Sequence, residues 1–213
     1  DLSSVEIIAY GAEAMPQKVL QRLAVAFPKA QLQQKFGTSE TGAIRIKSVD
    51  KHSLFFRIED SDTEWKIVED ELWLKTPSRI LGYLNAASNN LEADGWYATG
   101  DLVETDEAGN LRIIGRTSAL INVGGRKVHP AEVEAQLDTI EGIEASHVYG
   151  VGDPITGNKI CAKIVTSSDR DIREWKRKIR NHCRGKLSPW KIPSQIFLTK
   201  HLNVTDRLKR SDP

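Results

Sequence analysis

A carboxylate and a guanidinium lie fifteen residues apart near the middle of the chain, each directly after a glycine. Asp101 follows Gly100 in the segment Tyr97–Asp101, and Arg116 follows Gly115. An aspartate held on a tight turn can accept hydrogen bonds from two vicinal hydroxyls, and the fixed donors of an arginine suit a hydroxyl or a phosphate. The pair would suit a ribose phosphate, although either motif alone is more often an ordinary surface turn.

A glycine-rich segment follows Arg116. It contains Gly124 and Gly125, and it leads to Pro130 with Glu132 two residues later. Proline at the first position and an acid in the first turn are typical of a helix N-terminus. On its own, this pattern predicts a glycine-rich hairpin followed by a helix and indicates no ligand.

The ordered combination of these segments resembles the adenylate-forming superfamily, which includes acyl- and aryl-coenzyme A synthetases, luciferases and peptide-synthetase adenylation domains. Trp96–Leu102 and Gly115–Glu134 match most defining positions of its two patterns. The resemblance implies that Asp101 and Arg116 bind the ribose of ATP or AMP. It also implies that a loop containing Gly124 and Gly125 lines the pantetheine channel for coenzyme A, where glycine permits close approach of the backbone.

Two loops near the start of the chain extend the resemblance. The first matches a loop whose backbone lies against adenine, and the second, 36–40, matches a segment with an aromatic residue, a hydroxyl and an acid. By this resemblance Phe36 stacks on adenine, Ser39 meets the adenylate phosphate, and Glu40 holds Mg²⁺, which favours a carboxylate together with phosphate oxygens. The cofactor-binding residues implied here are Gly11, Ala12, Glu13, Phe36 and Gly37.

The C-terminal tail resembles the closing motif of the same family in part. Thr205 and Lys209 are in register, whereas Asn203 replaces a proline and Leu208 replaces a glycine. A lysine on such a loop can stabilise the charge that develops as pyrophosphate leaves. Lys209, with Ser39, is therefore the predicted catalytic residue; the alternative is an ordinary exposed terminal lysine.

Composition narrows the function classes only slightly. The chain has 213 residues and a net charge of +1, so bulk charge favours no partner such as nucleic acid. No stretch approaches the apolar length of a membrane span, and the N-terminus lacks the features of a signal peptide. The two cysteines, Cys161 and Cys183, have no metal or redox spacing, and a reducing cytoplasm is the expected compartment.

The predicted fold class is α+β, with residues 1–117 as the end of a large adenylate-forming domain and 118–213 as a small mobile lid domain. Residues 1–43 should form a βαβ piece, with a buried strand at Val5–Tyr10, a helix from Pro16 to Phe27 and a strand at Gln31–Phe36. Short runs of β-forming residues between turn residues predict a β-rich, barrel-like subdomain over 44–117.

The lid should alternate strands and helices, which predicts an α+β domain. A long helix is expected over 169–185 with Ser168 as its N-cap. Residues 170–186 carry eight basic and two acidic side chains. An apolar stripe at helical spacing should face inward, so a solvated basic face is favoured over nucleic-acid binding, and help with a polyphosphate ligand lies between the two. The stripe consists of Ile172, Trp175, Ile179 and Cys183.

Two departures from the family patterns bear on activity. Ser118 stands where the family's hinge is usually Asp or Lys, and a serine still permits backbone rotation. The Ser/Thr/Gly-rich loop ending in Pro-Lys-Gly, which holds the β- and γ-phosphates, and the N-terminal acyl pocket have no counterpart in this sequence. The chain lacks an initial Met and begins close to a strand. It is therefore expected to be a fragment that is inactive without an N-terminal region of the same enzyme.

These observations together predict part of an ATP-dependent ligase that makes an acyl-AMP from a small carboxylic acid and then an acyl thioester with coenzyme A. The cofactors implied are ATP or AMP, Mg²⁺ and coenzyme A. Two alternatives stay open. One is an adenylation unit that loads a carrier protein, and the other is a non-catalytic nucleotide-binding module of the same fold, which Leu208 slightly favours.

Overall fold

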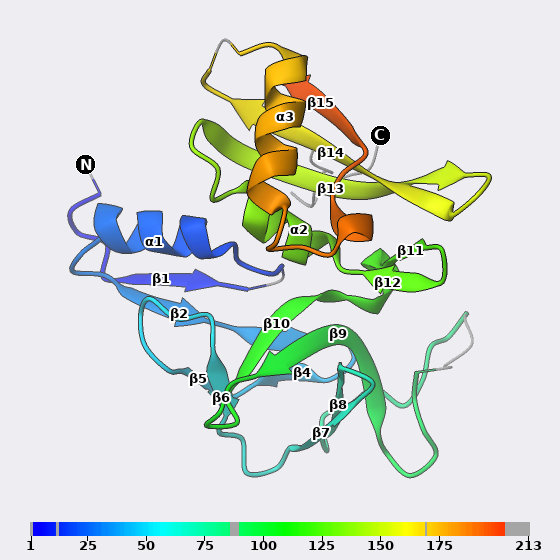
Figure 1. Cartoon of the computed structure of the whole chain (residues 1–213). Coiled ribbons are helices and arrows are strands. Elements are labelled where there is room, and N and C mark those ends of the chain that lie inside the picture. Colours follow the sequence, from blue (N-terminus) through cyan, green and yellow to red (C-terminus); the bar gives the residue numbers. More distant parts are fainter. Residues whose placement is uncertain (1, 12, 86–89, 169, 203–213) are drawn as a thin grey trace. The chain divides into compact units, whose positions relative to one another are not determined.

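The computed structural model describes residues 2–11, 13–85, 90–168 and 170–202 (Figure 1). The chain divides into two compact units, Asp1–Ser118 and Ala119–Pro213, each described by itself below. Both units mix helices with strands, and strands predominate. Within the described residues, no helix combines the length and the apolar character needed to cross a membrane.

The first unit begins with a strand, a helix and a strand that pairs in parallel with the first. These elements are β1 (Ile7–Tyr10), α1 (Gln17–Ala26) and β2 (Gln31–Gln34). The register places Ile7 opposite Gln31, which confirms the predicted βαβ unit. The prediction of a buried first strand is wrong, because only one of its faces packs on α1. Ile8 and Tyr10 lie against the cluster around Leu20, whereas Ile7 is 56% exposed.

A short β-hairpin follows β2 after one residue. Its strands are β3 (Phe36–Thr38) and β4 (Gly42–Ile44), which pair antiparallel. The prediction of one strand from Gln31 through Phe36 is therefore wrong. Parallel pairing ends at Gln34, and the backbone of Lys35 donates one last hydrogen bond to the Tyr10 carbonyl before the chain turns into the hairpin. The hairpin places residues 39–41 in its connecting loop.

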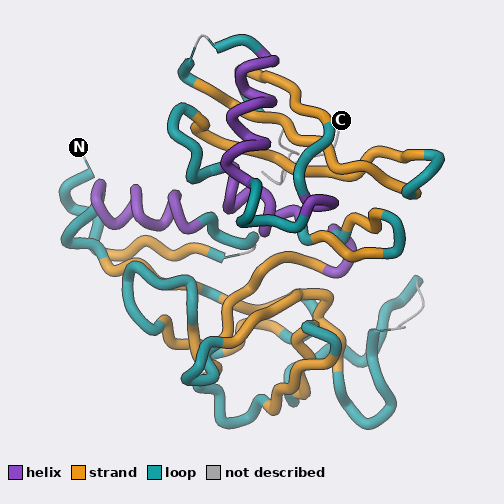
Figure 2. The backbone as a smooth tube through the Cα atoms, viewed as in Figure 1, coloured by secondary structure: helices purple, strands orange, loops and turns teal. Residues whose placement is uncertain are grey.

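The rest of the first unit is a six-stranded antiparallel sheet with the order β5-β6-β10-β9-β8-β7. Among the described residues β5 and β7 do not pair with each other, so the curved sheet in Figure 2 is an open half-barrel. Phe56, Leu72, Leu74 and Leu111 form its core, and Phe36 joins them from the hairpin. The strands are β5 (Ile46–Ser48), β6 (Phe56–Ile58), β7 (Glu64–Val68), β8 (Glu71–Lys75), β9 (Tyr97–Thr105) and β10 (Leu111–Arg116).

The second unit is a three-stranded sheet with two helices on one face, preceded by a hairpin. The sheet order is β13-β14-β15, and β15 runs parallel to β14. Val133 and Leu137 of one helix and Trp175 and Ile179 of the other pack with Ile160 in one core (Figure 1). The elements are β11 (Ile121–Val123), β12 (Arg126–Val128), α2 (Pro130–Leu137), β13 (Ile143–Asp153), β14 (Gly157–Thr166), α3 (Ile172–Cys183) and β15 (Gln195–Thr199).

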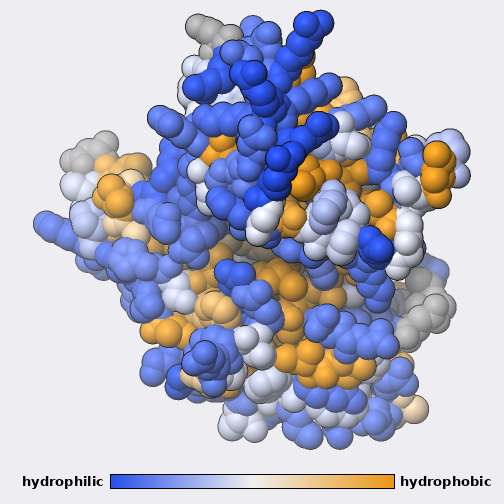
Figure 3. All heavy atoms as spheres, in the orientation of Figure 1, coloured by the Kyte–Doolittle hydropathy of each residue, from blue (hydrophilic) through white to orange (hydrophobic). Residues whose placement is uncertain are grey.

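The helix α3 has the predicted inward stripe. Trp175, Ile179 and Cys183 are buried, and Ile172 packs against them as a half-buried residue. Figure 3 shows hydrophilic side chains over the outward face of this helix, as expected from its basic residues. Burial of one apolar stripe therefore accounts for the position of α3 on the sheet.

The N-cap of α3 differs from the prediction. The helix begins at Ile172 with Asp171 as the N-cap, so the assignment of Ser168 is wrong. Asp171 Oδ1 accepts hydrogen bonds from the backbone N–H groups of Arg173 and Glu174, both at 2.8 Å, and Glu174 accepts one in return from the backbone of Asp171. This reciprocal arrangement satisfies donors that have no partner inside the helix.

Asp171→Ala is expected to lower the free energy of unfolding by about 1 kcal/mol, because those helix donors lose their acceptor. Ser168→Ala is the matched control and should leave the free energy of unfolding nearly unchanged. Urea unfolding followed by circular dichroism measures both variants. Equal losses from the two variants would contradict the assignment of Asp171 as the cap.

Candidate nucleotide site

Asp101 and Arg116 lie opposite each other on neighbouring strands of the half-barrel. Asp101 is on β9 and Arg116 is the last residue of β10, and the two are paired in the antiparallel register. The prediction of a turn at Asp101 is wrong, since the residue lies inside a strand. Gly100, with φ of 74°, makes an irregularity there, and the register of β8 with β9 shifts at the same place. Such a bulge redirects a side chain without ending the strand.

The Asp101 carboxylate is buried and paired with Arg116. Its Oδ1 lies 2.9 Å from Nε of Arg116, and the Asp101 side chain is 7% exposed against 51% for the arginine. Glu71 supports the bulge, because its Oε1 accepts a hydrogen bond of 2.7 Å from the backbone of Gly100. Thr99 Oγ1 accepts one from the backbone of Asp101 at 3.0 Å. The carboxylate is therefore held in one place, while the guanidinium reaches solvent.

Glu40 lies in the loop of the β3–β4 hairpin. Its Oε1 accepts a hydrogen bond of 2.7 Å from the hydroxyl of Tyr83. Within the same loop, Thr38 Oγ1 accepts hydrogen bonds from the backbones of Glu40 and Thr41. The Tyr83 hydroxyl holds the pKa of Glu40 below its ordinary value, against an opposing effect of burial. Glu40 is therefore a carboxylate that stays ionised at neutral pH, as a cation ligand must.

Tyr97 connects the two acidic sites. It begins β9, the strand that carries Asp101 four residues later, and its side chain is buried. Burial, followed by the nearby charge of Glu40, raises the pKa of Tyr97 far above its ordinary value. Tyr97 therefore stays protonated at every pH at which the fold would be studied, and β9 runs from the neighbourhood of Glu40 to the pair of Asp101 with Arg116.

The first predicted loop lies against the start of the hairpin. A Cβ on Gly11 would come within 2.5 Å of the Lys35 carbonyl oxygen, so only glycine permits this approach. Glu13 is exposed next to it, and Ala12 lies outside the described residues. Because Lys35 precedes Phe36, Gly11 lies beside the start of the second N-terminal motif.

Phe36 and Ser39 of the 36–40 segment differ in exposure. Phe36 is 7% exposed, and its ring packs against Phe56 with a centroid distance of 5.8 Å. In this arrangement little of the Phe36 ring is available to stack on a base. Ser39 is exposed in the loop, and Gly37 lies so close to the Gly42 backbone that a Cβ would not fit.

The remaining predicted residues belong to the second unit. Gly124 and Gly125 form the turn between β11 and β12, with φ values of 58° and 77° that other residues rarely adopt. The backbone of Gly124 donates a hydrogen bond of 2.7 Å to the Thr156 carbonyl, and Asn158 Nδ2 donates one of 3.0 Å to the Asn122 carbonyl. The tip of the β13–β14 hairpin therefore holds this turn. Lys209 lies outside the described residues.

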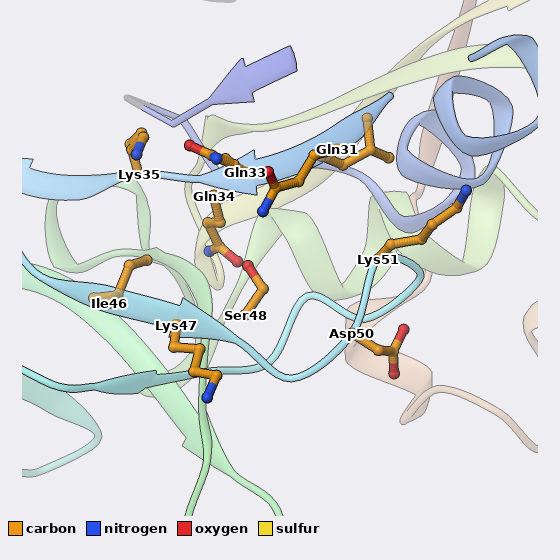
Figure 4. A pocket seen from close by; sticks show the side chains of 10 residues that line it. Gln31, Gln33, Gln34, Lys35, Ile46, Lys47, Ser48, Asp50 and Lys51 are labelled. Atoms are coloured by element: carbon orange, nitrogen blue, oxygen red, sulfur yellow. The ribbon is translucent and has the colours of Figure 1, made fainter. Parts of the chain in front are cut away.

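A hollow of about 520 Å³ lies between β2 and β5 in the first unit (Figure 4). Polar side chains such as Gln31, Gln33, Lys47 and Asp50 line it. None of the predicted site residues lines this hollow. It is therefore separate from the candidate site.

The arrangement suits a nucleotide with a bound cation. A buried carboxylate beside an arginine can accept from ribose hydroxyls, and a second, ionised carboxylate can hold a cation together with phosphate oxygens. Among the described residues no group of three or more His, Cys, Asp or Glu side chains is placed to hold a metal ion. Sequence reasoning did not place Tyr83 or Tyr97 beside Glu40. Tyr97 lies in the recognised segment Trp96–Leu102, but only the fold brings the two tyrosines to the acid.

The family model of the AMP-binding enzyme C-terminal domain matches residues 132–209. Among curated proteins, a 2-succinylbenzoate–CoA ligase of Listeria innocua is 34% identical over 182 residues, which are 82% of this chain and 38% of that protein. A long-chain-fatty-acid–CoA ligase of Haemophilus influenzae is 28% identical, and the aligned region spans 97% of this chain and 39% of that protein. The chain thus spans about two-fifths of the relatives it matches.

Solved structures give the same picture of the fold. The amide bond synthetase McbA of Marinactinospora thermotolerans superposes with a TM-score of 0.80 at 26% identity, over 99% of this chain and 46% of that one. An anthranilate CoA ligase, AuaEII, solved with anthranoyl-AMP, superposes with a TM-score of 0.77 at 22% identity, over 99% of this chain and 44% of that one. At 22% identity the second match supports the fold alone.

Proposed function

We propose a function from the family to which the chain belongs, the adenylate-forming superfamily, as the C-terminal part of an acyl- or aryl-CoA synthetase-like ligase. The chain would form part of an enzyme that activates a carboxylic acid with ATP and passes the acyl group to coenzyme A. A carboxylate oxygen of the acid attacks the α-phosphorus of ATP, and the bond to the β-phosphate oxygen breaks. Pyrophosphate leaves, and acyl-AMP remains. The sulfur of coenzyme A then attacks the acyl carbon, its proton is lost, and AMP leaves.

The observation that carries this proposal is the pairing of the buried Asp101 carboxylate with Arg116. The carboxylate is 7% exposed and 2.9 Å from the guanidinium, which fixes its orientation. In the proposed complex Asp101 accepts hydrogen bonds from both ribose hydroxyls, and Arg116 donates to the same ribose or to the adjoining phosphate. Adenine lies against the backbone of the loop at Gly11. A stacking role for Phe36 would need its ring to leave Phe56.

Glu40 fits the proposed role of Mg²⁺ ligand. Mg²⁺ usually binds through one or two carboxylates together with substrate phosphates and waters. Glu40 offers one carboxylate in an exposed hairpin loop, and its lowered pKa keeps it charged. When bound, the cation would neutralise charge on the phosphate oxygens of ATP. Ser39, in the same loop, would donate to the adenylate phosphate.

The second unit would act as the lid of the enzyme. Lys209 would stabilise the negative charge that develops when pyrophosphate leaves, and the turn at Gly124 and Gly125 would line the channel for the pantetheine arm of coenzyme A. A reducing compartment such as the cytoplasm suits the two cysteines, which are both buried and free.

The sequence contains no loop for the β- and γ-phosphates, so the 213 residues alone should not form acyl-AMP. Carboxylate-dependent exchange of pyrophosphate into ATP tests this. The chain is assayed alone and as a fusion behind the part of the Listeria innocua ligase that its match does not cover, with 2-succinylbenzoate as the acid. Only the folded fusion should exchange, and Lys209→Ala should lower the rate about 100-fold.

The other outcomes separate the alternatives. A folded fusion that binds ATP but exchanges with no acid would contradict a catalytic role and favour a non-catalytic nucleotide-binding module. Exchange without thioester formation from free coenzyme A would favour an adenylation unit that loads a carrier protein. The Listeria enzyme itself is the positive control for acid, cation and assay.

A further inference from the structure

We propose that Tyr83 is a positioning residue for Glu40, and that the segment 78–83 is the clamp that orients this acid toward the cation. The inference rests on the proposed function, because it takes Glu40 as the Mg²⁺ ligand. It adds a residue to that site for which the sequence predicts no role.

Three hydrogen bonds join the segment 78–83 to the hairpin loop. Ser78 Oγ donates to the carbonyl of Thr41 at 2.7 Å, and the backbone of Ile80 donates to the carbonyl of Glu40 at 2.7 Å. The Tyr83 hydroxyl donates to Glu40 Oε1 at 2.7 Å. Glu40 is therefore held at its main chain and at its side chain by the same short segment. The bond from Ile80 fixes the backbone of Glu40, and the bond from Tyr83 restricts the orientation of its carboxylate.

Tyr83 is itself held from the side of β9. Asn90 Nδ2 lies 3.4 Å from the Tyr83 hydroxyl, and the carbonyl of Asn90 accepts a hydrogen bond of 2.9 Å from the backbone of Ala98. Since Ala98 is on β9, the support of Tyr83 reaches the strand that carries Asp101. The clamp thus ties the proposed cation ligand to the strand of the proposed ribose ligand.

The chemistry of the contact suits a metal ligand. A carboxylate can accept about four hydrogen bonds, so one bond to Oε1 leaves capacity for a cation. Groups behind a ligand that orient it are a regular part of metal sites, and their loss lowers affinity about 10- to 100-fold.

The first test uses the 213-residue chain and needs no activity. Carbon-13 NMR of the glutamate carboxyls gives a signal for Glu40 in the whole chain. Mn²⁺ in the presence of AMP should broaden the Glu40 signal, and Tyr83→Phe should raise the Mn²⁺ concentration required about tenfold. Tyr10→Phe is the control; Tyr10 packs in the cluster of α1 and β2. Equal behaviour of Tyr83→Phe and wild type overturns the proposal.

The second test uses the fusion protein and separates this inference from the proposed function. In pyrophosphate exchange, Tyr83→Phe should raise the KM for Mg²⁺ about tenfold and leave kcat at saturating Mg²⁺ nearly unchanged. Asn90→Ala keeps the phenol and should give a smaller rise. If wild-type fusion does not exchange, the proposed function fails, and the broadening of the Glu40 signal by Mn²⁺ still decides whether Tyr83 positions Glu40. Exchange with an unchanged KM for Mg²⁺ in Tyr83→Phe overturns the positioning role.

Discussion

Asp101→Asn is expected to lower pyrophosphate exchange by the fusion protein about 100-fold. Asparagine keeps the shape of the side chain, but its amide carries no charge and offers one acceptor oxygen in place of two. A hydrogen bond to a charged group contributes about 1.5–3 kcal/mol, and 1.4 kcal/mol is a tenfold change. Losing one ribose contact, together with the charge that strengthens the other, therefore accounts for the effect. The KM for ATP should rise, and direct titration with AMP should show the same loss of affinity.

Glu104→Gln is the matched control for this variant. Glu104 is paired with Arg112 across the same two strands, with Oε1 and Nη2 2.6 Å apart, but both side chains are more than a third exposed. Removing that pair should cost less than about 1 kcal/mol of stability and leave exchange unchanged. If both variants lose activity equally, the effect comes from the sheet, and Asp101 is not a nucleotide ligand. A loss of exchange with unchanged AMP affinity would also contradict the ribose contact.

The elements of the fold follow from local sequence rules in most places. Pro16 directly before α1 and Pro130 at the start of α2 marked two helix starts, and apolar residues at helical spacing around Trp175 marked the inward face of α3. The failures have a common cause. The N-cap depends on whether Ser168 or Asp171 reaches the free helix donors, and both residue types suit that role. Only the packing of Ile172 and Trp175 on the sheet decides where the helix begins.

The sequence indicated which residues are candidates for the site, but not where the backbone places them or which residues they contact. The glycine before Asp101 indicated an irregular backbone, but a turn and a strand bulge share that signal, and the choice depends on Glu71 from another strand. The hydrogen-bond partner of Glu40 is even farther away along the sequence. Tyr83 lies 43 positions along the chain, and no local pattern connects the two residues. Contacts of this kind come from the order of strands in the sheet, which the sequence does not state.

Trp175→Ala should produce the largest loss of stability in the second unit, about 3–5 kcal/mol. The indole is fully buried between α3, β14 and the loop before β13, where a Cβ on Gly142 would come within 3.2 Å of its ring. Since a domain of this size is stabilised by about 5–15 kcal/mol, the unit should open at moderate urea concentration. Hydrogen exchange of the Ile160 and Ile164 amides on β14 reports this opening in the whole chain.

Two further variants separate loss of packing from loss of the ring's N–H group. Among the described residues the buried Nε1 of Trp175 has no hydrogen-bond partner, so Trp175→Phe removes an unpaired donor as well as some apolar area. It should cost clearly less than alanine, because an unpaired buried donor is itself unfavourable by about 1–3 kcal/mol. Trp65→Ala, at a side chain that is 40% exposed on β7, should cost about 1 kcal/mol and leave the β14 amides protected. If Trp175→Ala opens β14 no more than Trp65→Ala does, this indole does not hold α3 on the sheet.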